Sequence, residues 1–204
     1  GEGCKDLVIE NNFIYHCFDK GISVGQQSTA TVRNNVIAYT HIGIALKDES
    51  VAEVEHCTFF GNTQGVSAYE KNAGNLGGTG HITECIVSNA ALDAYDYDSY
   101  SGLTLTRCLS DLDSINGPGT WNTDPQFVNP TRYDFNLLPS SPAIGLGSGH
   151  TNLGANPLPV YTGQPQVLIS EILDDDTLAT TGEFLELFNP GSAIIDVSGY
   201  TLAA

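Results

Sequence analysis

The chain repeats itself with a period of 22 residues. Gly21, Gly43 and Gly65 are spaced by 22, and each opens a short apolar run, "GISV", "GIAL" or "GVSAY". Between these runs lies a second series in which apolar residues alternate with polar ones, namely "VIENNFI" (8–14), "TVRNNVI" (31–37), "EVEHCTF" (53–59), "HITECIV" (81–87) and "LTLTRCL" (103–109). Alternation with a period of two is typical of a half-buried β-strand. A repeat of this length with two or three short strands indicates one coil of a solenoid.

Stacked coils of this kind predict a parallel β-helix. One coil cannot bury its apolar face alone, but stacked coils pair strand to strand and share a continuous core. Inward positions should then form columns of similar residues. The spacing predicts four columns: Ile22, Ile44 and Val66; Val24, Leu46 and Ala68; Val32, Val54, Ile82 and Leu105; Ile14, Ile37 and Phe59.

Five further residues share one place in successive coils. They are Asn12, Asn35, Cys57, Cys85 and Cys108. An inward Asn at a turn can bond the backbone of neighbouring coils, and Cys is a small residue that buries readily. We therefore expect a buried structural ladder, because a reactive thiol needs an exposed, electropositive setting.

The number and spacing of the cysteines favour neither a metal site nor a full set of disulfides. The chain has five Cys and no CxxC pair, which disfavours a zinc site, and the odd count disfavours a fully disulfide-bonded framework. Whether Cys4 and Cys17 pair is left open by the sequence.

The repeat fades along the second half of the chain. A Gly-rich stretch, residues 70–80, should protrude as a loop, and the Pro- and Asn-rich region from residue 110 should cap the open end of the solenoid. The expected organisation is therefore a β-helix with its cap over 1–147, a linker over 148–166, and a new β-rich unit over 167–204.

Charge excludes some partners. The formal net charge is −17, with 24 acidic residues against 7 basic ones, so neither nucleic acid nor an anionic membrane surface is an expected partner. No apolar run approaches the roughly 18 residues that span a bilayer, so no membrane insertion is expected.

Two stretches resemble known families. Residues 7–147 resemble the right-handed parallel β-helix repeats of the pectate-lyase-like superfamily of bacterial secreted proteins, most specifically in "DPQFVNPTRYDFNLLPSSPAIGLG" (124–147). Residues 167–202 resemble the start of a lamin-tail domain, through "ISEI" (169–172), "GEFLELFNP" (182–190) and "DVSGYTL" (196–202). The resemblance implies an all-β chain: a right-handed parallel β-helix with a C-terminal cap, then part of an immunoglobulin-like β-sandwich. It also implies a fragment of a larger secreted or cell-surface protein.

The β-helix superfamily includes polysaccharide lyases, which need a Lys or Arg base and a cation beside the substrate carboxylate. Lys47 and Lys71 are the candidate catalytic residues, with Asp48, Glu49 and Glu70 alongside. The alternative is that each Lys forms a solvated ion pair with neighbouring acids.

A glycoside hydrolase would need two carboxylates across a groove. Asp93, Asp96 and Asp98 alternate with Tyr95 and Tyr97, so a strand would direct Asp96 and Asp98 to one side and the tyrosines to the other. These five residues are the candidate sugar-binding site, and Asp96 with Asp98 is the candidate Ca²⁺ site. The alternative is a plain polar face.

The expected function is a non-catalytic extracellular scaffold or adhesion module that contacts carbohydrate. The alternatives are a polysaccharide lyase or glycoside hydrolase, and a fibre subunit that binds copies of itself through strand edges or coil ends. Whatever chemistry the chain has is expected where consecutive coils differ, as "GQQS" (25–28) differs from "KDES" (47–50).

Overall fold

The computed structural model describes residues 3–112, 116–155, 168–173 and 184–188. Contacts divide the chain into two units, one formed by Gly1–Val128 with Phe135–Leu158 and the other by Asn129–Asp134 with Pro159–Ala204. Most of the expected linker and of the expected sandwich lies outside the described residues.

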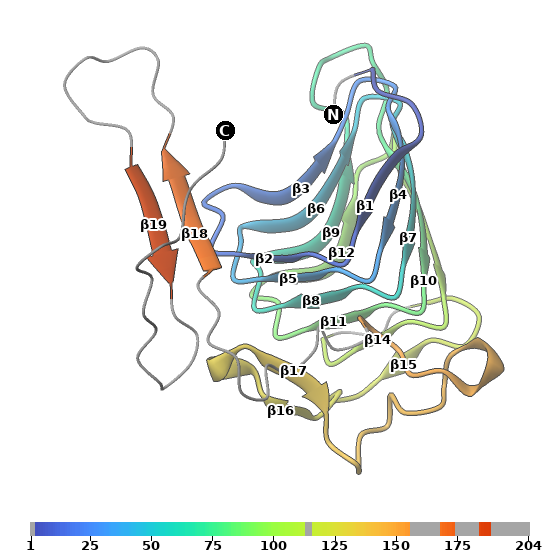
Figure 1. The fold of residues 1–204 in the computed structure, drawn as a ribbon. Helices are drawn as coiled ribbons and strands as arrows, with labels where there is room; N and C mark the ends of the chain where they lie inside the picture. Colours follow the sequence, from blue (N-terminus) through green and yellow to red (C-terminus); the bar gives the residue numbers. More distant parts are fainter. Residues whose placement is uncertain (1–2, 113–115, 156–167, 174–183, 189–204) are drawn as a thin grey trace. The chain divides into compact units, whose positions relative to one another are not determined.

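Three parallel sheets form the first unit, and successive strands of the chain belong to the first, second and third sheet in turn (Figure 1). The first sheet has the order β1 (Leu7–Glu10), β4 (Thr29–Arg33), β7 (Val51–Glu55), β10 (Thr79–Thr83), β13 (Gly102–Thr106). The second has β2 (Phe13–Tyr15), β5 (Val36–Ala38), β8 (Thr58–Phe60), β11 (Ile86–Ser88), β14 (Leu109–Ser110), β15 (Trp121–Asn122). The third has β3 (Lys20–Val24), β6 (Ile42–Lys47), β9 (Gln64–Tyr69), β12 (Asp93–Tyr97). The predicted all-β, right-handed parallel β-helix is confirmed.

The register of these strands confirms the four predicted columns. Ile22 lies opposite Ile44, and Ile44 lies opposite Val66. The same pairing runs through the other three columns: Val24, Leu46 and Ala68; Val32, Val54, Ile82 and Leu105; Ile14, Ile37 and Phe59. Nearly all of these side chains belong to one buried cluster, so the columns are the core.

The repeated glycine has a steric cause. A Cβ atom on Gly21 would lie 2.5 Å from Cγ2 of Ile37, and one on Gly43 would lie 2.7 Å from Cδ1 of Phe59. Each glycine therefore marks the corner where the third sheet passes close to the inward column of the second.

Another corner depends on left-handed backbone. The residue before each ladder position has a positive φ, between 48° and 58°, in all five coils: Asn11, Asn34, His56, Glu84 and Arg107. Asn and His tolerate this conformation better than most side chains, which accounts for Asn11, Asn34 and His56 at three of these positions.

The C-terminal part of the first unit covers the solenoid in two places. Strand β15 adds a last rung to β14, and the preceding turn lies against the final coil, where Arg107 N–H donates to Pro118 O at 2.8 Å. Residues 143–153 instead cover the outer side of the second sheet, where Ile86 and Leu109 are buried against Ala143 and Leu153. The predicted cap thus extends from the end of the solenoid onto its side.

Aromatic rings continue this cover. The strands β16 (Phe127–Asn129) and β17 (Asp134–Leu137) form a small sheet, and a 3₁₀ turn (Pro130–Arg132) connects them. The ring of Phe135 lies 5.3 Å from that of Phe60 and 5.8 Å from that of Phe13, centroid to centroid. A second 3₁₀ turn spans Ser148–His150.

Within the Pro159–Ala204 part of the second unit, two strands are described. Strand β18 (Leu168–Leu173) pairs antiparallel with β19 (Phe184–Phe188), with a register shift between Ile169 and Glu171. The remainder of the expected immunoglobulin-like part lies outside the described residues. Within the described part of the chain, no helix is long and apolar enough to cross a membrane.

Candidate functional site

The ladder positions bond the backbone of adjacent coils. The side-chain amide of Asn35 donates to the carbonyl oxygens of Ile9 and Arg33 at 2.8 and 3.0 Å. Its Oδ1 accepts the N–H of Asn12 at 3.0 Å. Asn35 therefore connects backbone groups of its own coil and of the preceding coil.

Cys57 repeats this arrangement one coil later. Its thiol donates to the carbonyl oxygens of Val32 and Glu55 at 3.6 and 3.3 Å, and its N–H donates to Sγ of Cys85 at 3.4 Å. All five cysteines are free thiols. Burial raises the pKa of Cys85 and of Cys108, which keeps both thiols neutral rather than nucleophilic.

Lys47, the first catalytic candidate, lies at the end of β6 and is only 8% exposed. Its alkyl chain runs along Gly25, where an added Cβ would lie 3.2 Å from Cε and 3.7 Å from Nζ. Its charge is among the groups that lower the pKa of Asp19, after the stronger effect of the Lys20 hydrogen bond. Lys47 therefore packs against the solenoid with carboxylates nearby.

Lys71, the second candidate, is exposed in the inserted loop. Its backbone N–H donates to Oδ1 of Asp48 at 2.8 Å, and Asn72 donates to Asp48 through its N–H at 2.9 Å and its side chain at 2.5 Å. Burial would raise the pKa of Asp48, but these bonds and the Lys47 charge hold it below its usual value. Asp48 thus fastens the loop, and it reaches Lys71 through the backbone.

The carboxylates of Asp96 and Asp98 are engaged by different donors. Asp96 accepts from Nε2 of Gln64 at 2.9 Å and from Oγ of Ser67 at 3.4 Å. Asp98 accepts the N–H of Glu70 at 2.7 Å and the hydroxyl of Ser101 at 2.8 Å. The Glu70 bond is the main cause of the lowered pKa of Asp98.

Ca²⁺ needs about six to eight oxygen ligands that converge on one point, whereas Asp96 and Asp98 bond separate sets of donors. Within the described ranges, no group of three or more His, Cys, Asp or Glu side chains could hold a metal ion. The acidic residues of this strand stabilise turns and neighbouring strands instead.

The two tyrosines of this strand both lie opposite residues of the inward columns, but they differ in exposure. Tyr95 lies opposite Val66 and packs against the core, and burial raises its pKa well above the usual value. Tyr97 lies opposite Ala68 but is 58% exposed, because β12 is the edge of its sheet. Asp93 is exposed at the start of the strand. The five residues therefore do not form one binding surface.

Sequence reasoning missed a buried carboxylate. Glu84 accepts from Nε of Arg107 at 2.7 Å and from the N–H of Ser148 at 2.8 Å, and its Oε2 lies 3.2 Å from Nε2 of His56 and 3.3 Å from the hydroxyl of Thr151. Burial would raise the pKa of Glu84, but these partners lower it to about 2. Because Ser148 and Thr151 are far away in sequence, only the positions of His56 and Arg107 in equivalent turns hinted at this cluster.

One described groove crosses three successive turns. We call it the aromatic groove; it has a volume of about 670 Å³ and is lined by His16, Cys17, Phe18, Asp19, Tyr39, Thr40, His41, Gly61 and Thr63. These residues follow β2, β5 and β8, so the turns that form the groove are equivalent parts of adjacent coils.

One wall of the aromatic groove is a column of rings. The rings of His16 and Tyr39 stack at 5.4 Å with an interplanar angle of 15°. Gly61, the next residue of the column, has a φ of 63°, and a Cβ there would lie 2.8 Å from Cδ1 of Tyr39. Gly61 thus leaves room for the Tyr39 ring, while Phe18 at the rim is fully exposed.

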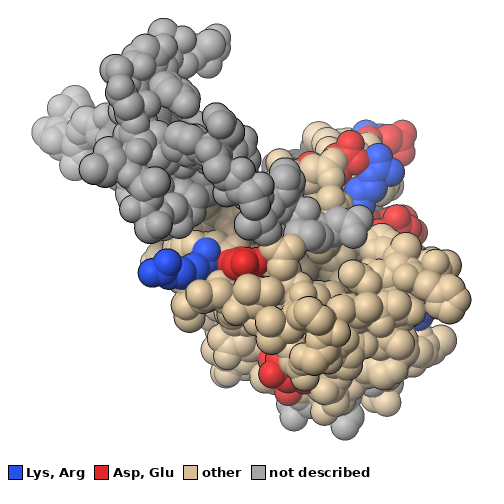
Figure 2. Space-filling model, turned by 60° about the horizontal axis from the view of Figure 1, so that its bottom comes forward, with Lys and Arg blue, Asp and Glu red and all other residues tan. Residues whose placement is uncertain are grey.

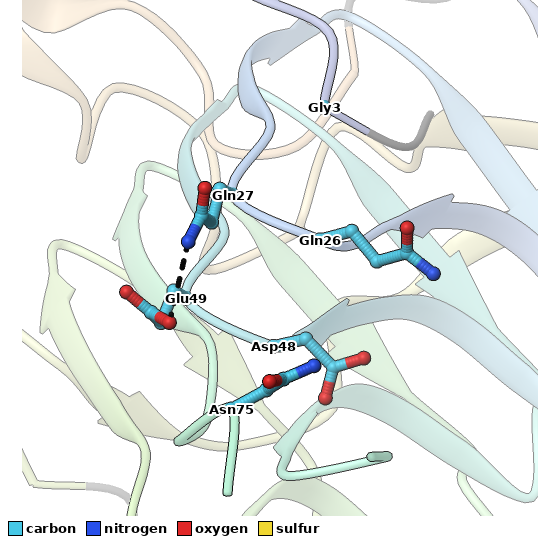
Figure 3. A pocket seen from close by; sticks show the side chains of 6 residues that line it. All are labelled: Gly3, Gln26, Gln27, Asp48, Glu49 and Asn75. Atoms are coloured by element: carbon cyan, nitrogen blue, oxygen red, sulfur yellow. Dashed lines mark hydrogen bonds between the residues drawn. The ribbon is translucent and has the colours of Figure 1, made fainter.

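A second groove of about 320 Å³ lies at the "GQQS" and "KDES" turns (Figure 3). It is lined by Gly3, Gln26, Gln27, Asp48, Glu49 and Asn75. The Gln27 amide approaches Oε1 of Glu49 at 3.4 Å, and the Asp48 carboxylate points toward the loop that it fastens. This groove is polar, has no aromatic lining, and both of its carboxylates already accept hydrogen bonds.

Comparison with known proteins gives one result. Among curated proteins, no match was found. Residues 2–78 match the family model described as "Right handed beta helix region", so the first coils of this chain are similar to that family in sequence as well as in fold.

Proposed function

We propose that this chain is a non-catalytic, extracellular scaffold module that contacts carbohydrate, as part of a larger secreted or cell-surface protein. The observation that carries the proposal is the aromatic groove, which is built on rigid, hydrogen-bonded turns of the solenoid. Ring-lined grooves with a few polar groups are typical of ligand sites, and a rigid scaffold lowers the entropy cost of binding.

Surface charge supports a ligand that is not a polyanion. The net charge of −17 repels nucleic acid and anionic surfaces. On the face shown in Figure 2, the larger blue areas of Lys and Arg each adjoin red Asp or Glu, so they do not form an extended basic patch.

The contacts of Asp48, Asp98 and Lys47 also favour binding over catalysis. Asp48 holds the inserted loop, Asp98 holds the following turn, and Lys47 packs along Gly25. Each side chain therefore has a structural role, and these contacts would have to be broken before the group could act on a substrate.

The proposal is tested by co-sedimentation with insoluble polysaccharides, namely cellulose, xylan, mannan and chitin. We expect the protein to sediment with at least one of them and to leave it chemically unchanged. If it sediments with none of them, the carbohydrate-contacting part of the proposal is wrong.

A polysaccharide lyase is a second candidate, favoured by the lysines around β3 and β6. The charge of Lys47 reaches Asp19, Asp19 is bonded to Lys20, and Lys20 interacts with the phenol of Tyr69. Two ammonium groups beside a phenol and a carboxylate could bind a uronate and remove a proton.

An assay with polygalacturonate as substrate and added Ca²⁺ distinguishes the two candidates. It measures the ultraviolet absorbance of the unsaturated products that a lyase releases. The scaffold proposal expects no product. Product that disappears in Lys47→Ala and persists in the exposed control Lys5→Ala would replace it with the lyase.

Self-association is a third candidate, favoured by the edge strands. In the described part of the chain, β1, β2 and β3 each pair with one neighbour and lie at the ends of their sheets. Such edges can add a strand from another copy. Light scattering that rises steeply with concentration would support a fibre subunit, whereas a constant mass would oppose it.

A further inference from the structure

We propose that the aromatic groove is the carbohydrate site and that it takes a neutral, unbranched glycan lying along the solenoid axis. This inference rests on the function proposed above and adds to it the site, the direction and the class of ligand. It places the sugar site away from residues 93–98. The side chains of that stretch contact different partners and do not form one surface.

The direction follows from the way the turns stack. His16 N–H donates to Ala38 O at 3.1 Å, and Tyr39 N–H donates to Phe60 O at 2.9 Å, so each turn is tied to the next coil. Neighbouring coils are separated by about 4.8 Å, the spacing of paired strands. A groove across three coils therefore runs perpendicular to the strands and extends for about two such spacings, which suits consecutive sugar rings of a linear chain.

The lining offers both kinds of contact that a sugar needs. Apolar C–H faces of a pyranose can pack on aromatic rings, whose faces carry partial negative charge. Phe18 is fully exposed and offers its ring at the rim of the groove. Sugar hydroxyls can bond the Asp19 carboxylate and the Thr63 hydroxyl, which also line the groove.

Charge selects a neutral ligand. The lining contains one carboxylate, Asp19, which pairs with Lys20 outside the lining, and two histidines, His16 and His41, but neither Lys nor Arg. A uronate polymer would therefore meet no Lys or Arg of the lining and would approach a protein with a net charge of −17.

The groove is also held in shape before a ligand arrives. Tyr39 is confined between the His16 ring and the Cα of Gly61, and its edge meets Phe60 at 5.7 Å. Asn62 accepts from both the N–H and the hydroxyl of Thr40, at 2.9 and 3.0 Å, and donates to Ile37 O. A wall fixed in this way loses little freedom on binding.

Isothermal titration calorimetry with cellohexaose, xylohexaose and mannohexaose tests the inference, with a galacturonic acid hexamer as the acidic comparison. We expect at least one neutral hexaose to bind and the acidic hexamer to bind more weakly. Phe18→Ala should weaken binding about tenfold through the lost ring contact. The matched control is Tyr100→Ala, since Tyr100 is 60% exposed at a turn outside the groove and its loss should leave affinity unchanged.

Each contrary result identifies what fails. Glycan binding that is equally strong in Phe18→Ala would overturn the site and leave the proposed function standing. Preference for the acidic hexamer would overturn the ligand class. Binding of a lysine-rich peptide in place of any hexaose, lost in Phe18→Ala, would overturn both the ligand class and the carbohydrate function.

Discussion

Asn35 and Cys57 occupy successive rungs of one ladder and bond equivalent backbone groups. The amide of Asn35 and the thiol of Cys57 each donate to a carbonyl two residues earlier and to a carbonyl of the preceding coil. A thiol is a weaker donor and acceptor than an amide. At the residue scale, the position therefore requires a small side chain with hydrogen-bonding capacity, and the strength of the bond can vary.

Replacement of Asn35 tests this requirement. Asn35→Ala removes the acceptor of the Asn12 N–H and a donor to the carbonyl oxygens of Ile9 and Arg33, so the free energy of unfolding should fall by about 2 kcal/mol. Asn35→Cys, which copies the next rung, should cost about 1 kcal/mol or less. Urea denaturation of both variants measures the difference, and equal losses would contradict the ladder interpretation.

Side chains of the repeat were predictable because the strands have a period of two and the coils have a period of 22. Alignment of Gly43 with Gly21 and Gly65 put Ile44 in one column with Ile22 and Val66, and the structure places it there. Asp96 and Tyr97 were harder, because β12 is an edge strand and its side chains find partners, or solvent, that no periodicity encodes. Phe18 belongs to a turn, where side-chain direction depends on backbone conformation rather than alternation.

At the scale of elements, the segment over residues 147–155 is fastened to the solenoid by Glu84. Two bonds to its carboxylate come from Ser148 and Thr151, and the backbone of Glu84 accepts the N–H of Gly154 at 2.8 Å. This attachment could not be read from the sequence, since the partners are more than 60 residues apart. It keeps Ile86 and Leu109 away from water, because the same segment supplies Leu153, which is buried with them and with Ala143.

The lowered pKa of Glu84 makes this attachment dependent on pH. The folded value of about 2 lies below the ordinary value of 4.5, so the ionised carboxylate stabilises the fold. That contribution is complete above about pH 4.5 and is lost as pH falls toward 2. Glu84→Gln should lower the free energy of unfolding at neutral pH by about 1.5–3 kcal/mol and remove this part of the acid dependence.

Urea denaturation at pH 7 and pH 3 measures both effects. Glu53→Gln is the matched control, because Glu53 lies on an exposed strand position and pairs only loosely with His81 at 4.0 Å. It should change stability by less than about 0.5 kcal/mol. If Glu84→Gln kept the full acid dependence of the parent, the role assigned to Glu84 would be wrong.

Across the whole molecule, charge acts against stability. With 24 acidic and 7 basic residues, most pairs of charges repel, and the folded chain holds them closer than the unfolded chain does. Raising ionic strength from about 0.01 M to about 0.1 M shortens the screening length from about 30 Å to about 10 Å.

This screening should raise the Tm of the protein by about 2–4 °C, the shift that about 1 kcal/mol produces in a chain of this size. Circular dichroism melting in sodium chloride measures it, and choline chloride at equal ionic strength controls for specific binding of sodium. A Tm that is constant or falls with salt would show that repulsion is not a significant cost to this fold.

The inserted loop has a consequence for how such a chain can change. Val51 pairs with Thr79, 28 residues later, whereas Thr29 pairs with Val51, 22 residues later, and the rungs on either side remain in register. Residues added at this corner therefore leave the pairing register of the strands unchanged. Each doubling of a flexible loop costs only about 0.6 kcal/mol in closure entropy. Evolution, or an engineer, can therefore graft new sequence between Tyr69 and Thr79 and test new contacts there while the solenoid beneath stays the same.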